Sequence, residues 1–274
     1  MYQKIKKLGE SIRGLYSLPT GKLLYLSILI PTVLIAFFAV VVALTGGGHE
    51  FKEEAREIPM LGILAAAVQT FGRIIIAYIF AVIFSVTLAI FTVRSPRTEK
   101  VLLPIIDILQ SVPILAFFPI LVFLFVQFGL FNLAAIVVFF FTMLWMMTFS
   151  LIGGLKIIPR EILSMSKVFN FSKYQYIRHI IIPAITPQLV TASILAWSQS
   201  WNIAIVAEVL HTYLPVGSTV RDLPGIGSEL VKAITDGNTY IFLAAVTVMI
   251  IFIAIINIFI WQNLLNYAQK FRFE

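Results

Sequence analysis

Lys156–Pro187 reads KIIPREILSMSKVFNFSKYQYIRHIIIPAITP and is the only long basic, polar interruption in the second half of a very apolar chain. Pro159 followed by Glu161 is typical of a helix start, because proline fits the first turn and an acid there complements the helix dipole. The helical pattern runs to about Phe169, and Asn170 falls where a turn with left-handed backbone is needed. A second short amphipathic piece follows. We expect two short helices with a bend that dock on another surface.

The same loop carries five basic side chains: Lys156, Arg160, Lys167, Lys173 and Arg178. Anionic lipid headgroups attract such segments beside a membrane, at about 1 kcal/mol for each basic residue. From composition alone, a solvated loop on anionic lipid is therefore as good an interpretation as a docking element.

The composition excludes a soluble domain. The chain has 274 residues, of which 60% are hydrophobic and 12% charged, and spans of about 20 apolar residues fill most of it. The net charge of +7 needs no nucleic-acid partner, since cytoplasmic loops of membrane proteins collect Lys and Arg. The absence of cysteine excludes disulfides, thiolate metal sites and a cysteine nucleophile. Three histidines predicted on different sides of the membrane, His49, His179 and His211, argue against a shared metal site.

Six apolar segments predict an all-α polytopic membrane protein with one transmembrane domain over 23–274, preceded by a cytoplasmic segment 1–22. The expected spans are 23–44, 71–93, 101–127, 132–152, 184–210 and 240–264. An interfacial helix to about Val68 is expected before the second span. We expect the third span to be broken by Pro104, Pro113 and Pro119.

The distribution of charge orients these spans. Of the 20 Lys and Arg residues, five precede the first span, three lie in 94–100, five in the loop 156–183 and two in the tail. These fifteen fall on one side if both termini are cytoplasmic, which satisfies the positive-inside rule. The segments 45–59 and 211–239 are then external, and 95–100 is a short inner loop. We predict a multi-pass protein of the cell membrane.

Polar residues inside the spans are candidate functional residues, because lipid penalises them unless they face a cavity or a partner. The densest run is Trp197-Ser198-Gln199-Ser200-Trp201-Asn202. Trp197 and Trp201 share one helical face, and we expect Gln199 and Asn202 to point away from it. The functional interpretation is a solute pathway that includes Trp197, Ser200, Trp201 and Asn202. The alternative is contact between helices, in which Ser, Asn and Gln are common.

Two charged residues lie near the predicted outer ends of spans. Arg73 is a candidate for favouring the entry of an anion, and interfacial snorkelling is its alternative. Glu208 is a candidate for closing a gate or pairing with a base such as Arg73, and snorkelling is again the alternative. Both are counted among the predicted pathway residues.

Several motifs resemble a known family. The spacing of the loop is similar to the EAA loop of ABC importer permeases, with Pro183 at the closing proline, Asn170 at the glycine, and Ser164, Met165 and Ser166 at Glu-Ala-Ala. Other stretches resemble the anion-type permeases of the nitrate, sulfonate and taurine group, most of all one half of its duplicated branch. These stretches are DILQSVPILAFFP (107–119), FTMLWMMTFSLIGGLKIIPRE (141–161), LPGIGSEL (223–230) and YAQKFRFE (267–274).

The resemblance implies a type I ABC importer permease fold with a core unit over about 61–264 and a coupling loop over 156–183. It implies the transport of a small anionic solute delivered by an external binding protein. The implied partners are two ATPase subunits, which would bind ATP and Mg, and a second permease subunit, identical or paralogous. The residues implied for coupling are Ser164, Met165, Ser166, Asn170 and Pro183, with Glu161 replacing the missing glutamate.

Other functions remain open from the residues alone. The chain has no Gly-rich phosphate loop followed by Lys and Ser or Thr, so we expect no ATPase activity, no resident cofactor and no other enzyme activity in it. A secondary transporter or a channel would work without an ATPase, although the basic loop and the lack of a mid-membrane carboxylate or histidine relay argue against both. A membrane anchor for another complex is the third interpretation.

Overall fold

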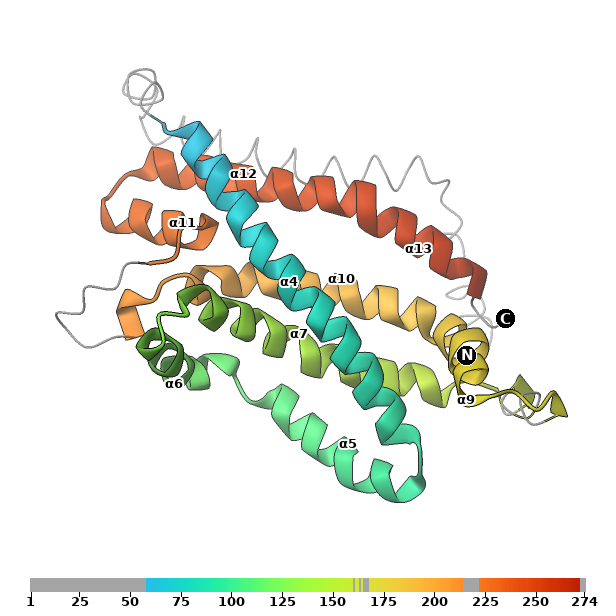
Figure 1. Cartoon of the computed structure of the whole chain (residues 1–274). Helices are drawn as coiled ribbons and strands as arrows, with labels where there is room; N and C mark the ends of the chain where they lie inside the picture. The colour runs from blue at the N-terminus through green and yellow to red at the C-terminus, as the bar shows by residue number, and fades with distance from the viewer. Residues whose placement is uncertain (1–57, 160, 163, 165–167, 214–221, 272–274) are drawn as a thin grey trace, which may run out of the picture.

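The computed structural model describes residues 58–159, 161–162, 164, 168–213 and 222–271 (Figure 1). These ranges are helical and contain no strand, which confirms the predicted all-α class. The predicted cytoplasmic segment 1–22 and the first predicted span, 23–44, lie outside the described residues.

Helix α4, Met60–Val93, is one continuous helix of 34 residues. The expected division into an interfacial helix to Val68 and a span from Phe71 is therefore wrong. The expected junction stays helical because no proline removes a backbone donor there. At 1.5 Å per residue the helix is about 51 Å long, whereas the hydrocarbon core of a bilayer is about 30 Å thick. Such a helix must tilt or extend beyond the hydrocarbon.

The expected third span consists of two helices, α5 (Pro96–Ser111) and α6 (Ile114–Gln127), with a bend of 83° between them. The break lies at Pro113. Val112, directly before this proline, has extended backbone with φ −77° and ψ 124°, because a following proline disfavours helical backbone. The predicted break at Pro113 is confirmed.

Two other expectations for this region are corrected. Pro104 and Pro119 lie inside α5 and α6 and do not break them; membrane helices tolerate proline where neighbouring groups satisfy the freed backbone carbonyls. The expected loop 95–100 forms the beginning of α5. The hydroxyl of Ser95 caps this helix by accepting a hydrogen bond from the Thr98 backbone N–H at 3.1 Å.

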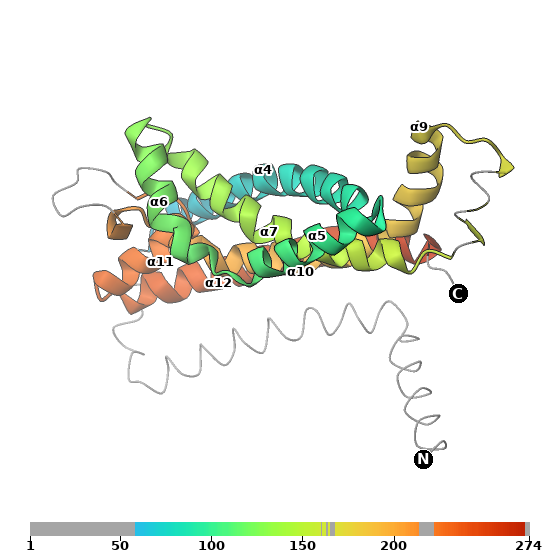
Figure 2. The ribbon, with the colours of Figure 1, turned by 90° about the horizontal axis from the view of Figure 1, so that it is seen from below.

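Helix α7, Phe131–Lys156, lies at the centre of the described part and contacts α4, α5, α6 and α10, Ile182–Ala207 (Figures 1 and 2). Small residues such as Ala77, Ala135 and Ala196 are fully buried in the main core. Their size lets the helices approach closely, which is how helices pack in membranes without a hydrophobic driving force between them.

The remaining elements mark the two ends of the helices. At one end lies α9, Lys173–Tyr176, which leads through the π-helical turn η1, Ile177–Ile181, into α10. At the opposite end, the segment predicted to be external contains α11, Ile226–Thr235.

The last predicted span is confirmed as a helix and continues farther than expected. It consists of α12 (Thr239–Ile256), the π-helical turn η3 (Asn257–Trp261), α13 (Gln262–Ala268) and η4 (Gln269–Phe271). With the bent α5–α6 pair taken as one span, up to five stretches of the described residues are long and apolar enough to cross a membrane. They correspond to the second through sixth predicted spans.

Candidate functional site

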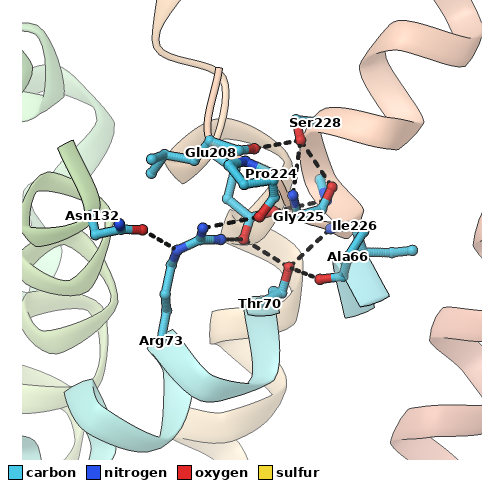
Figure 3. Close-up of polar contacts among 11 residues, drawn as sticks. Ala66, Thr70, Arg73, Asn132, Glu208, Pro224, Gly225, Ile226 and Ser228 are labelled. Atoms are coloured by element: carbon cyan, nitrogen blue, oxygen red, sulfur yellow. Dashed lines mark hydrogen bonds and ion pairs between the residues drawn. The ribbon is translucent and has the colours of Figure 1, made fainter. Parts of the chain in front are cut away.

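A buried polar network joins four helices at the predicted outer end (Figure 3). The guanidinium of Arg73 on α4 lies 2.7 Å from Oε1 of Glu208, which directly follows α10. Arg73 also donates to Oδ1 of Asn132 on α7 and to the backbone carbonyl of Pro224, each at 2.9 Å. Arg73 is 7% exposed and Glu208 is fully buried. The network therefore binds the ends of α4, α7 and α10 to the segment before α11.

The carboxylate of Glu208 receives two further donors. The hydroxyl of Thr70 donates to Oε1 at 2.7 Å, and the backbone N–H of Gly227 donates to Oε2 at 2.9 Å. The same Thr70 hydroxyl accepts from the N–H of Ile226 at 2.9 Å. A buried carboxylate is costly unless it is paired and hydrogen-bonded, and both conditions are met here.

Two glycines of the LPGIGSEL stretch allow this close approach. A Cβ atom on Gly225 would collide with the Glu208 carboxylate, and one on Gly227 would collide with the backbone carbonyl of Ala204. The turn itself is held by Ser228, whose hydroxyl accepts from the Gly225 N–H and donates to the Leu223 carbonyl at 2.6 Å. These glycines are needed for space, because α11 packs directly on the end of α10.

The network decides between the alternatives for Arg73 and Glu208. Their pairing, predicted as one possibility for Glu208, is confirmed, and neither side chain snorkels to the surface. Three of the Arg73 nitrogens are already hydrogen-bonded inside the protein. A direct role of either residue in contacting solute stays a prediction.

The basic loop lies at the opposite end and bends where the sequence predicts. Asn170 has φ 48°, and no other non-glycine residue in the described ranges has positive φ. Ser172 then begins α9 with a capping box: its hydroxyl accepts from the Gln175 N–H, and the Gln175 side chain accepts from the Ser172 N–H at 2.9 Å. The left-handed turn and the cap together reverse the chain within a few residues.

Apolar and aromatic side chains around this bend are exposed. They are Val168, Phe169, Phe171 and Tyr174. Such side chains on an exposed turn are typical of a docking surface. Glu161 and Ser164 are helical and exposed, and Pro183 lies in the first turn of α10. Met165 and Ser166 lie outside the described residues.

The base of the loop is tied to the neighbouring helix. Nζ of Lys156, at the end of α7, lies 2.6 Å from Oε1 of Glu99 in the first turn of α5. Both side chains are partly exposed, and such pairs contribute about 0–1 kcal/mol. The contact aligns the two helices at the start of the loop.

Trp197 lies at the centre of an aromatic cluster. Its ring makes edge contacts with Phe71 at 5.8 Å, Tyr78 at 5.5 Å and Trp261 at 5.8 Å between centroids. Each such pair contributes about 0.5–1.5 kcal/mol. The ring thus joins α4, α10 and η3, and this supports the helix-contact alternative for Trp197.

A cavity of about 220 Å³ lies between α10 and the last span. Trp197, Trp201, Ser198 and Asn202 line it from α10, and Asn257 lines it from the other side. Asn202 lines the same cavity as Trp197 and Trp201, so the expectation that it points away from the tryptophan face is wrong. The face of α10 that lines this cavity extends from the two tryptophans to Asn202. Ser200 is fully buried and donates to the carbonyl of Ala196 at 3.1 Å. The pathway role of these residues stays a prediction.

A larger cavity of about 770 Å³ lies on another face of α10 and is lined by Gln199. It is formed where the bend at Pro113 separates α5 from α6, and α7 contributes Thr142 and Trp145. At the bend, the Val112 N–H still donates to the Ile108 carbonyl of α5 at 3.1 Å, and the Ala116 N–H of α6 donates to the Pro113 carbonyl at 2.9 Å.

Some residues of these sites did not emerge from the sequence as site residues. Asn132 completes the Arg73 network from α7, and nothing in its local sequence indicates it. Thr70 lies one turn before Arg73 on the same helix, but its contact with Glu208 depends on the position of α10. Gln199 is polar and lies inside a span, but helical periodicity alone gives no reason to prefer its face. The LPGIGSEL stretch, at 223–230, was the one available signal for the α11 contact.

Comparison with known proteins identifies the family. Residues 81–266 match the family described as binding-protein-dependent transport system inner membrane component. The chain is 30% identical over 173 residues to the nitrate import permease protein NrtB of Leptolyngbya laminosa, covering 62% of this chain and 60% of that protein. It is 24% identical over 149 residues to the taurine transport system permease protein TauC of Escherichia coli, covering 54% of this chain and 53% of that protein. The aligned regions span about half to three fifths of these relatives.

A solved structure has the same fold. It is the MetNI methionine ABC transporter in inward-facing conformations, with a TM-score of 0.64 at 17% identity, and the match covers 77% of this chain and 98% of that chain. At this identity the likeness concerns the fold alone. Since the family match extends over more than half of the residues, the chain belongs to the family of binding-protein-dependent transport system inner membrane components, the membrane-embedded permeases of ABC importers.

Proposed function

We propose that this chain is the permease half of an ATP-driven importer for a small anionic or zwitterionic solute, which an external binding protein delivers. The relatives that the chain resembles are named for nitrate, bicarbonate and taurine, and this supports the solute class. Two ATPase subunits would supply the energy and bind ATP and Mg, and a second permease subunit would complete the pathway.

The observation that carries this proposal is the geometry of the basic loop. The left-handed turn at Asn170 and the capped helix after it present exposed apolar side chains at the end of α7 and α10. A rigid, apolar turn at the end of two spans fits a surface groove on a partner protein. Movement of that partner would be passed directly to α7 and α10. Glu161, exposed on the first arm of the loop, is proposed to replace the glutamate that is missing at Ser164.

The proposal also fixes the orientation. The loop end is cytoplasmic, the Arg73–Glu208 network lies toward the outside, and both termini are cytoplasmic. The basic residues of the loop support this orientation. The external binding protein would approach the end that carries α11.

The experiment is to express the chain with a candidate ABC ATPase subunit from the same organism and to measure nitrate and taurine uptake together with ATPase co-purification. We expect ATP-dependent uptake of at least one of these solutes and a stable complex. Uptake that persists when the ATPase is inactivated would favour a secondary transporter or channel. A stable complex without any uptake would favour a membrane anchor.

A further inference from the structure

The cavity of about 770 Å³ at the α5–α6 bend has a property that the sequence did not reveal. Its lining combines apolar side chains with five polar ones, Gln110, Ser111, Thr142, Trp145 and Gln199, and contains no charged side chain. The Arg73–Glu208 network and the basic loop carry charged side chains, whereas the lining of this cavity is uncharged.

Three of the five polar side chains are already bonded to their own helices. Gln110 donates to Oδ1 of Asp107 at 2.9 Å, and the Ser111 hydroxyl donates to the Asp107 carbonyl at 2.8 Å. The Thr142 hydroxyl donates to the Val138 carbonyl at 2.8 Å. These contacts fix the side chains, so their hydroxyl and amide oxygens remain as acceptors.

The other two have donors available. Gln199 and Trp145 line the cavity, and among the described residues neither the amide of Gln199 nor the indole N–H of Trp145 has a hydrogen-bond partner. Trp145 is held in place because its ring stacks on Phe141 with centroids 6.0 Å apart. Gln199 is exposed. Together they offer three N–H donors from two helices, α7 and α10, to a molecule in the cavity.

We propose that this cavity is the solute site of the subunit, and that Gln199 and Trp145 bind a solute carrying at most one net negative charge. The inference rests on the proposed function and names its site. The described lining contains no cation. An anion that loses its hydration there is therefore compensated only by neutral hydrogen-bond donors. That loss rises with the square of the charge, so a divalent oxyanion is rejected far more strongly than a monovalent one. A site of neutral donors also lets the solute leave again, which transport requires.

Gln199 and Asn202 provide a matched pair of variants, because both are exposed amides on α10 that face different cavities. We expect Gln199→Leu to reduce nitrate or taurine uptake at least tenfold while complex yield and basal ATP hydrolysis stay unchanged. Asn202→Leu, which changes the smaller cavity instead, should reduce uptake less than Gln199→Leu does. Gln199→Lys should add uptake of sulfate, because it supplies the missing cation.

The outcomes separate this inference from the proposed function. A wild type with no ATP-dependent uptake of nitrate, taurine or sulfate would contradict both. Normal uptake in Gln199→Leu, or a larger loss in Asn202→Leu, would overturn the site while leaving the importer intact. Sulfate uptake by the wild type that exceeds nitrate and taurine uptake would overturn the charge limit.

Discussion

Arg73 and Glu208, 135 positions apart in the chain, form a buried ion pair in which Nη1 lies 2.7 Å from Oε1. One residue belongs to α4 and the other directly follows α10, so the pair fixes the distance between two spans at their predicted outer ends. Both partners have additional hydrogen bonds, and neither is free to meet a solute in this conformation. We infer that the pair holds the outer end of the subunit together.

Removing one partner should destabilise the subunit strongly. Arg73→Met or Glu208→Leu leaves the opposite charge buried and unpaired, at a cost of about 3–5 kcal/mol. The double variant Arg73→Met/Glu208→Leu buries no unpaired charge and should regain part of that loss. Thermal unfolding of the purified subunit in detergent measures the difference. Strictly additive losses would show that the two residues do not act as a pair.

Gly227→Ala should prevent α11 from packing on α10. The added Cβ would collide with the backbone carbonyl of Ala204, and a backbone atom cannot move aside as a flexible side chain can. The matched control is Gly153→Ala in α7, where the added Cβ meets nothing within 4 Å. Alanine in a helix is favoured over glycine by roughly 0.5–1 kcal/mol, so the control should be neutral or slightly stabilised. Equal melting temperatures for the two variants would contradict the packing argument.

The sequence predicted the features that depend on local chemistry. Hydropathy located the second through sixth predicted spans, the Asn170 spacing predicted the left-handed turn, and the rule for residues before proline explains the break at Pro113. Pro104 and Pro119 were misjudged because a proline's effect depends on its surroundings, which the sequence does not show. The length of α4 differs from the prediction because a helix can tilt or extend beyond the hydrocarbon, so a span need not match the bilayer thickness.

The candidate sites were less predictable because they depend on contacts between distant segments. Glu208 suggested a base as its partner, yet Asn132 completed the network from α7 without any local signal. On α10, Gln199 and Asn202 are three residues apart, and periodicity places them close in angle. Only the positions of α7 and α12 show that they face different cavities.

Single-cysteine labelling should establish the orientation, since the chain has no cysteine of its own. Val168→Cys lies on the loop, where the native side chain is 76% exposed, and Ile234→Cys lies on α11, where it is 62% exposed. In intact cells, a membrane-impermeant maleimide should label Ile234→Cys and leave Val168→Cys unmodified. After the membrane is permeabilised, both should react. Labelling of Val168→Cys in intact cells would invert the predicted topology.

The turn at Asn170 gives the most direct test of coupling. Glycine adopts φ 48° without strain, so Asn170→Gly should keep full activity. Valine is β-branched, and forcing it into this conformation costs about 1–3 kcal/mol, which the loop can avoid only by changing its shape. Asn170→Val should therefore weaken ATPase co-purification or separate ATP hydrolysis from uptake, while membrane insertion is unchanged.

The measurement is ATPase co-purification together with ATP hydrolysis and solute uptake in proteoliposomes. Asn170→Gly serves as the matched control, because it changes the same side chain without introducing strain. Glu161→Ala should produce a similar loss if Glu161 replaces the missing glutamate, and adding Ser164→Glu should partly restore coupling. Wild-type coupling in Asn170→Val would mean that the left-handed turn is not required for docking, and the proposed role of the bend would be wrong.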